Sequence, residues 1–287
     1  MTMPSFGERL RAAMDAHGPL CVGIDPHREL LEAWGLPFDL GGVERFTRTC
    51  VEAFGGAVAC VKPQSAFFEV FGSRGVAVLE RALRDLRHAG TLTILDAKRG
   101  DIGSTMAAYA QAFLGNDSPA PADAVTVSPY LGYGALRPAI DLAHATGRGV
   151  FVLALTSNPE GRSVQHARAG DGRSVAQTIL DGAAADNAAA RDAGRLGSVG
   201  LVVGATVGTA VADLGLDLRS TAAPLLAPGL GAQGASAADV RRVFAGALDQ
   251  VLPTTSRGVL AAGPSVGALR AAARIEAAAL ASLLGSG

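Results

Sequence analysis

The sequence has few cysteines and no metal-binding motif. Its 287 residues include three cysteines, Cys21, Cys50 and Cys60, which form no CxxC pair. This odd, scattered set indicates neither a disulfide framework nor a zinc site, and a reducing cytoplasm is the expected location. The histidines show no HxH or HExxH spacing, which predicts incidental surface or packing positions for all of them. They are His17, His27, His88, His144 and His166.

An excess of one charge and long apolar runs are also missing. Twenty-five basic residues face 26 acidic ones, and this balance gives no support for a nucleic-acid partner. No stretch approaches about 18 uninterrupted apolar residues, so no membrane span is expected. Residues 1–18 have the spacing of a short amphipathic helix and lack the apolar run of a signal peptide.

The chain does contain a regular alternation of short apolar runs and longer helical patterns, which is typical of parallel βα units. The expected strands span 19–25, 57–62, 91–98, 123–129, 149–157, 199–205, 223–229 and 249–256. Eight repeats in a chain of this length predict an α/β fold, a closed (β/α)8 TIM barrel that occupies residues 1–287 as a single domain. An open doubly wound sheet remains an alternative.

Polar residues interrupt these apolar strands at their C-terminal ends. The positions are Asp25, Lys62, Asp96, Lys98, Ser128 and Ser157, with Gln233 and Arg257 in the last two units. Active sites of β/α barrels are built at this end of the strands. The pattern therefore predicts one active site to which most of the strands contribute.

The densest cluster is the segment LDAKRGDIGST, in which Asp96, Lys98 and Asp101 form D-x-K-x-x-D. Asp96 and Lys98 share one face of a strand end, because strand side chains repeat every two residues. A lysine among carboxylates keeps its proton and is suited to donate it. The simpler alternatives are a surface salt bridge with Asp101 as a helix N-cap, and turn or snorkelling roles for Asp25 and Lys62.

Two connections are longer than usual and leave C-terminal strand ends, so each is a candidate lid or ligand loop. The first, 158–173, is polar and basic, and its Arg162 and Arg168 are candidates for closing over a phosphate. The second, PGLGAQGAS, lets backbone N–H groups approach an anion before a helix that is expected to begin at Ser236 or Ala237. Together with Arg257 it predicts a phosphate site, although such a loop alone is often an ordinary turn.

These motifs, in this order, resemble the orotidine 5'-phosphate decarboxylase family, in its longer bacterial branch typified by mycobacterial sequences. The resemblance covers nearly the whole chain, through GIDP, VKPQSAFFE, LDAKRGDIGST, TSNPEG, APGLGAQG and TTSRG. It implies decarboxylation of orotidine 5'-monophosphate to uridine 5'-monophosphate and CO2, the last step of de novo pyrimidine biosynthesis. It also implies that the enzyme needs no cofactor or metal and forms a homodimer with shared active sites.

The resemblance assigns a charged catalytic array to four positions. Lys62, Asp96 and Lys98 correspond to three of its members, and Asp101 corresponds to the fourth, which is supplied to the active site of the other subunit. In this array Lys98 would stabilise and then protonate the C6 carbanion, while Lys62 and Asp101 hold Lys98 and Asp96 in position.

The resemblance also assigns substrate contacts. Asp25 corresponds to a ribose-hydroxyl ligand, and Thr105 corresponds to a threonine that crosses the interface to touch ribose. Ser157 corresponds to the serine that bonds the pyrimidine amide. Gln233 and Arg257 correspond to phosphate ligands, whereas the insertion 158–173 departs from the compact family members and its contacts cannot be transferred.

Two other functions compete with this one. A magnesium-dependent sugar-phosphate lyase of the hexulose-phosphate synthase type carries a similar D-x-K-x-x-D, but it holds its metal with an acidic residue where this chain has Lys62. A non-catalytic nucleotide-phosphate binding barrel would need Arg257 and the glycine-rich loop but not the acidic and basic cluster.

Overall fold

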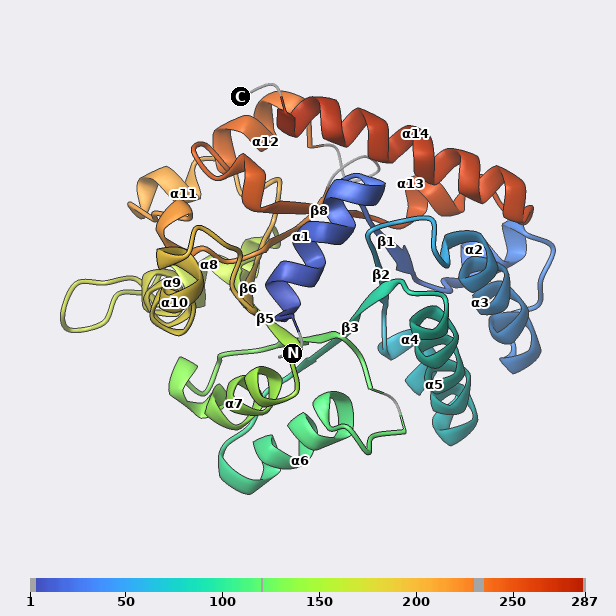
Figure 1. Ribbon diagram of the computed structural model, residues 1–287, viewed down its shortest axis with the longest axis horizontal. Coiled ribbons are helices and arrows are strands. Elements are labelled where there is room, and N and C mark those ends of the chain that lie inside the picture. The colour runs from blue at the N-terminus through green and yellow to red at the C-terminus, as the bar shows by residue number, and fades with distance from the viewer. Residues whose placement is uncertain (1–3, 120, 230–234, 286–287) are drawn as a thin grey trace.

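Eight parallel strands close into a barrel in a computed structural model that describes residues 4–119, 121–229 and 235–285 (Figure 1). Each strand pairs with the next one along the chain, and β8 pairs with β1. The strands are β1 (Cys21–Ile24), β2 (Cys60–Pro63), β3 (Leu92–Arg99), β4 (Ala124–Val127), β5 (Gly149–Leu155), β6 (Val199–Val203), β7 (Leu225–Pro228) and β8 (Val251–Thr255). The predicted barrel is confirmed, and the open-sheet alternative is wrong.

Helices surround the strands, and the first of them lies across one end of the barrel (Figure 1). They are α1 (Phe6–His17), α2 (Arg28–Ala33), α3 (Leu40–Phe54), α4 (Ala66–Glu69), α5 (Gly72–His88), α6 (Gly103–Leu114), α7 (Arg137–Ala145), α8 (Arg162–Gln165), α9 (Val175–Asp186), α10 (Ala188–Asp192), α11 (Ala210–Asp213), α12 (Ala237–Val243), α13 (Arg257–Leu260) and α14 (Val266–Gly285). Short 3-10 helices are η1 (Tyr133–Leu136), η2 (Pro159–Gly161), η3 (Arg219–Thr221) and η4 (Leu248–Gln250). Within the described residues, none of the helices combines the length and apolarity that crossing a membrane requires.

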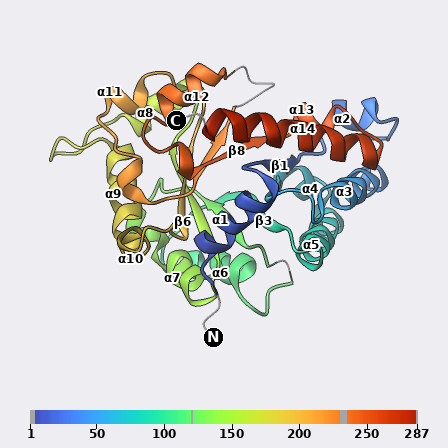
Figure 2. The ribbon, with the colours of Figure 1, turned by 45° about the horizontal axis from the view of Figure 1, so that its top comes forward.

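Helix α1 confirms the predicted amphipathic helix near the start of the chain. Ser5 and Glu8 form a capping box at its beginning, which satisfies backbone donors that have no partner inside the helix. Its apolar face buries Phe6, Leu10 and Met14 against residues from the starts of the strands. The helix lies across the barrel in Figures 1 and 2 and covers its amino-terminal end. The carboxyl-terminal end is therefore the one left open for ligands.

The alternative interpretation of Asp101 as a helix N-cap is wrong. Helix α6 begins at Gly103 after Ile102, and the Asp101 carboxylate accepts a hydrogen bond from the Ile102 N–H at 2.8 Å. Farther along the chain, helices α9 and α10 meet at Asn187. The Asn187 side chain bonds the backbone of Val199 and the carbonyl of Thr221, so it is anchored to the barrel.

Candidate active site

A cleft of about 410 Å³ opens at the carboxyl-terminal ends of the strands. Parallel strands that run in the same direction around a barrel all end at one rim, so residues far apart in the sequence meet there. The cleft brings together six of the residues singled out in the sequence. They are Asp25, Lys62, Asp96, Lys98, Ser157 and Arg257.

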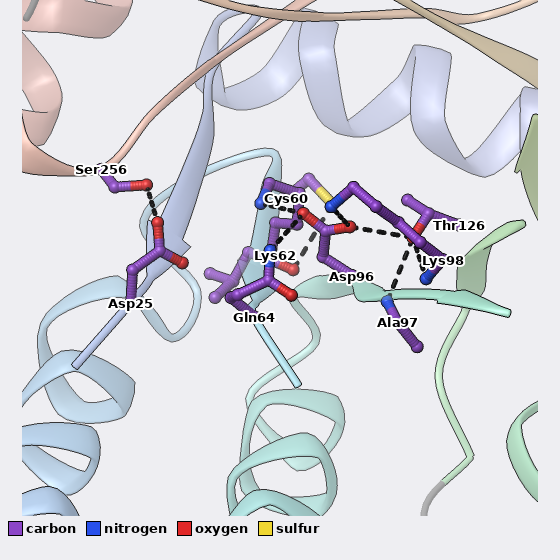
Figure 3. A network of polar contacts seen from close by, with 10 residues as sticks. Asp25, Cys60, Lys62, Gln64, Asp96, Ala97, Lys98, Thr126 and Ser256 are labelled. Carbon is purple, nitrogen blue, oxygen red and sulfur yellow. Dashed lines mark hydrogen bonds and ion pairs between the residues drawn. The ribbon is translucent and has the colours of Figure 1, made fainter. Parts of the chain in front are cut away.

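Asp96 is the centre of a polar network at the base of this cleft (Figure 3). Its Oδ2 atom accepts hydrogen bonds from Lys62 Nζ at 2.7 Å and from Gln64 Nε2 at 3.1 Å. Its Oδ1 atom accepts from Lys98 Nζ at 2.6 Å and from Thr126 Oγ1 at 2.9 Å. Both oxygens of one buried carboxylate are thus held by ammonium groups, and its remaining acceptor sites by neutral donors.

The two lysines differ in their access to the cleft. The side chain of Lys62 is 9% exposed, whereas that of Lys98 is 45% exposed. These are the only two lysines in the sequence, since the other 23 of its 25 basic residues are arginines. An arginine keeps its charge under all ordinary conditions, whereas an ammonium group can give up a proton. Lysine therefore occurs in this chain only beside Asp96.

Electrostatics fix the charge state of the buried pair. Burial disfavours the charged forms of both groups, but the attraction between them outweighs it. The ammonium groups of Lys62 and Lys98 hold the pKa of Asp96 well below its ordinary value. The carboxylate of Asp96, with a smaller contribution from Asp25, raises the pKa of Lys62 well above the usual 10.5. The pair stays ionised at neutral pH.

The backbone of Lys98 is strained, and Thr126 holds it in place. Lys98 has a φ of +46°, in the left-handed region that residues with a side chain seldom adopt. Thr126 Oγ1 accepts hydrogen bonds from the backbone N–H groups of Ala97 at 3.1 Å and Lys98 at 3.0 Å. The same hydroxyl donates to Asp96, so it sets the strand end and the carboxylate together. Such strain is concentrated at functional sites.

The opposite wall of the cleft carries Asp25 and Arg257. Ser256 donates a hydrogen bond to Asp25 Oδ2 (Figure 3), while the buried Oδ1 atom has no partner among the described residues. Arg257 begins α13 and is exposed, and its guanidinium group forms no ion pair or hydrogen bond within the described part of the chain. Nearby Gly229 has a φ of +106°, which glycine tolerates without strain. An unpaired acceptor and an unpaired cation therefore face the same space.

Two predicted site residues do not line this cleft in the described structure, and a third lies outside the described residues. Asp101 is half-buried and Thr105 is exposed, and neither lines the cleft of its own chain. Gln233 lies outside the described residues. Ser128, another polar strand end, donates its backbone N–H to the carbonyl of Arg99 and is likewise not part of the lining.

Several residues of the cleft were not predicted from the sequence. Gln64 lies two residues beyond Lys62 on the same strand face, and that spacing was an available signal. Thr126 and Ser256 carried none, because hydroxyl residues are ordinary in and after strands. His27, for which the sequence predicts a surface or packing position, packs its ring against Phe67 with centroids 4.2 Å apart and also lines the cleft.

Known proteins resemble this chain closely in sequence. The family model described as "Orotidine 5'-phosphate decarboxylase / HUMPS family" matches residues 18–272. An orotidine 5'-phosphate decarboxylase of Salinispora tropica is 64% identical over 99% of this chain and 100% of its own length. The one from Streptomyces coelicolor is 62% identical over 94% of this chain and 95% of its own.

Solved structures show the same likeness. A crystal structure assigned to an orotidine 5'-phosphate decarboxylase of Streptomyces avermitilis has a TM-score of 0.94 and 59% identity, over 100% of this chain and 98% of that one. The orotidine 5'-monophosphate decarboxylase of Leishmania donovani has a TM-score of 0.73 and 31% identity, over 99% of this chain and 100% of that one.

Proposed function

Because this chain belongs to the orotidine 5'-phosphate decarboxylase / HUMPS family, we propose that it converts orotidine 5'-monophosphate to uridine 5'-monophosphate and CO2, with Lys98 as the proton donor. This reaction is the last step of de novo pyrimidine biosynthesis, a pathway that we place in the cytoplasm. The observation that carries the proposal is the contact between Lys98 and Asp96. It presents a half-exposed ammonium group to the cleft from a rigid strand end.

The reaction breaks the bond between C6 of the pyrimidine ring and its carboxylate. The electron pair stays on C6, CO2 leaves, and the Lys98 Nζ–H group transfers a proton to C6, after which water restores the ammonium group. The positive charge of Lys98 stabilises the carbanion before the transfer. Asp96 lies beside the substrate carboxylate, and the repulsion between the two is relieved as CO2 forms.

The remaining cleft residues bind the substrate away from the reacting bond. Arg257, with Gln233 of the glycine-rich loop, holds the phosphate, since its planar fork matches phosphate oxygens. The unpartnered Oδ1 atom of Asp25 accepts a ribose hydroxyl. Ser157 bonds the pyrimidine amide. Binding energy from these distant contacts orients the ring over Lys98.

The described residues favour this reaction over a magnesium-dependent lyase. Both oxygens of Asp96 already accept from ammonium groups, so a divalent cation would have to displace Lys62 or Lys98 from a carboxylate at 2.7 and 2.6 Å. Lys62 also places a positive charge where that enzyme type has an acidic ligand.

A direct assay separates the three functions. The absorbance change of orotidine 5'-monophosphate is followed with the purified protein, with and without EDTA. We expect turnover that EDTA does not alter. Activity lost with EDTA and restored by Mg²⁺ would point to the lyase, and binding of the nucleotide without turnover would point to a non-catalytic barrel.

We further propose that the active form is a homodimer in which Asp101 and Thr105 act in the partner's cleft. Both residues follow β3 yet lie outside the cleft of their own chain. Beside them, Ile102 is 62% exposed, and Tyr130 and Leu131, which follow β4, are 78% and 53% exposed. Exposed apolar residues beside a half-built site are typical of a protein interface.

Mixing two inactive variants tests the shared site. In a heterodimer of Lys98→Ala and Asp101→Ala, one cleft carries both defects and the other carries neither. Equal mixing should restore about a quarter of the wild-type sites, because half of the dimers are mixed and each has one intact cleft. Subunit exchange is followed with two affinity tags, and exchange without recovered activity would rule out the shared cleft.

A further inference from the structure

A second cleft, of about 600 Å³, opens at the other end of the barrel, beneath α1 and beside the starts of β3, β4 and β5. Its ionisable lining residues are Arg9, Arg87, Asp123, His144 and Arg148. With His144 neutral, three guanidinium groups and one carboxylate leave two positive charges uncompensated. The sequence analysis and the proposed function assign no role to this surface.

Arg148 is the unusual member of this group. The residue is only 5% exposed, yet within the described residues no carboxylate lies within 4 Å of it. Its Nη1 atom donates to the carbonyl of Leu114 and to Asn116 Oδ1 at 3.2 Å, while Nε and Nη2 donate to none of the described residues. Burial and the charges of Arg87 and Arg9 lower its pKa from the usual arginine value, although the carboxylate of Asp123 partly offsets them. Arg148 therefore presents a positive charge to the cleft without a directly bonded carboxylate.

The carboxylate of Asp123 in the same cleft makes its direct bonds to other groups. Asp123 is bonded to Arg9 at 2.6 Å and accepts from the backbone and hydroxyl of Thr93. Arg9 also donates to the carbonyl of Gly147. Arg87, in the last turn of α5, is exposed, and its guanidinium group has no partner in the described part of the chain.

A neighbouring cleft at the same end of the barrel shows what a purely structural arginine cluster looks like here. It is lined by four arginines, and three of them have carboxylate partners from other lining residues. The pairs are Arg11 with Asp15, Arg195 with Glu8, and Arg219 with Asp249. Three of the four arginines in that cleft have carboxylate partners from its lining, whereas only Arg9 has one in the larger cleft, so the unpaired Arg87 and Arg148 are a distinct feature.

We propose that this second cleft binds a small, multiply charged phosphate anion of the inorganic diphosphate class. Guanidinium groups bind phosphate oxygens through paired N–H donors, and the two uncompensated charges match a polyanion. Apart from the imidazole of His144, the lining contains no ring on which a nucleobase could stack. The ligand is therefore recognised through its phosphoryl groups. The site lies at the opposite end of β3 from Asp96 and Lys98, so it is separate from the catalytic cleft.

Calorimetric titration with inorganic diphosphate tests the site. The protein is first saturated with uridine 5'-monophosphate, and divalent cations are omitted. We expect saturable binding that Arg87→Gln weakens about tenfold, which is the effect of losing one charged hydrogen-bonding partner. The matched control is Arg84→Gln, which removes the same charge from an exposed position on α5 outside the lining. ADP should bind no more tightly than diphosphate.

Three results would overturn the proposal. The first is an absence of saturable diphosphate binding. The second is binding that Arg257→Gln abolishes while Arg87→Gln leaves it unchanged, because the ion would then occupy the catalytic cleft. The third is ADP binding far more tightly than diphosphate, which would mean that a nucleobase is recognised and the ligand class is wrong.

Discussion

The two ends of the barrel use positive charge in different ways. At the carboxyl-terminal end, two lysines share one buried aspartate, and one of them faces the cleft. At the amino-terminal end the cations are arginines, most of which pair with carboxylates or bind main-chain carbonyls, while the side chain of Arg87 does neither within the described residues. The chemistry of the two side chains explains the division, because an ammonium group can transfer a proton and a guanidinium group cannot.

Strand β3 connects the two ends, and beside it lie the buried carboxylate of Asp96 at one end and the partly buried carboxylate of Asp123 at the other. Asp96, near the end of β3, accepts from two ammonium groups, one amide and one hydroxyl. Asp123, just before β4, accepts from Arg9 and from the backbone and hydroxyl of Thr93. Both are well-bonded acids, but only Asp96 lines a cleft beside a group that can give up a proton. Bonding alone therefore does not distinguish a catalytic carboxylate from a structural one.

The largest expected effect comes from removing Lys98, the proposed proton donor. Lys98→Ala should abolish turnover, with a fall in kcat of at least about 10³-fold, because general acid catalysis and charge stabilisation are lost together. The kcat of Lys98→Arg should fall nearly as far, although this variant keeps the positive charge. Steady-state kinetics with orotidine 5'-monophosphate measure both variants.

Stability provides the control for this pair of variants. Lys98 is half-exposed, so its bond to Asp96 should contribute about 0–1 kcal/mol, and unfolding in urea should be nearly unchanged. Normal decarboxylation by either variant would contradict the role of Lys98. Substantial activity in Lys98→Arg alone would mean that its charge matters and its proton does not.

The second comparison exchanges the two carboxylates for amides. Asp96→Asn leaves Lys62 buried without a counter-ion, which should cost about 3–5 kcal/mol of unfolding free energy, and should lower kcat by about 10²-fold. Asp123→Asn should cost about 1–3 kcal/mol and leave kcat unchanged, while diphosphate binds more tightly in the second cleft. Urea unfolding and kinetics on both variants provide the measurements. An equal loss of kcat in both variants would contradict the functional difference between the two ends of the barrel.

Much of this architecture could be predicted from the sequence, and the reason is geometric. Polar residues that end separate parallel strands meet at one rim whatever the details, so Asp25, Lys62, Asp96 and Lys98 could be placed together without a structure. The role of Thr126 could not, because it depends on the register between β3 and β4 over 30 residues of chain. The same applies to the isolated charge of Arg148, since only the fold shows which carboxylates are too far away to pair with it.

A smaller effect should come from Thr126→Val, which keeps the shape but removes the hydroxyl. The backbone N–H groups of Ala97 and Lys98 would lose their acceptor at a strained position, at a cost of about 1–3 kcal/mol. If Thr126 positions the catalytic groups, kcat should fall about tenfold for each 1.4 kcal/mol lost in the transition state, with little change in KM. Thr126→Ser should restore activity. Loss of stability with normal kcat would show a structural role alone.

The smallest expected effect is a pH dependence of the unfolding free energy that arises at only one end of the barrel. In the folded protein the pKa of Asp96 is lowered below its ordinary value, so the stability it contributes is present above about pH 4, the pKa of an unfolded aspartate. That stability is lost as the pH falls toward the folded pKa, because the unfolded chain takes up a proton that the folded chain refuses. Each pH unit in this window removes up to about 1.4 kcal/mol for one such group. Between about pH 5 and pH 2, the unfolding free energy measured in urea should therefore fall more steeply for the wild type than for Asp96→Asn. Parallel curves for the two proteins would mean that the ammonium groups do not hold the Asp96 carboxylate in its charged form.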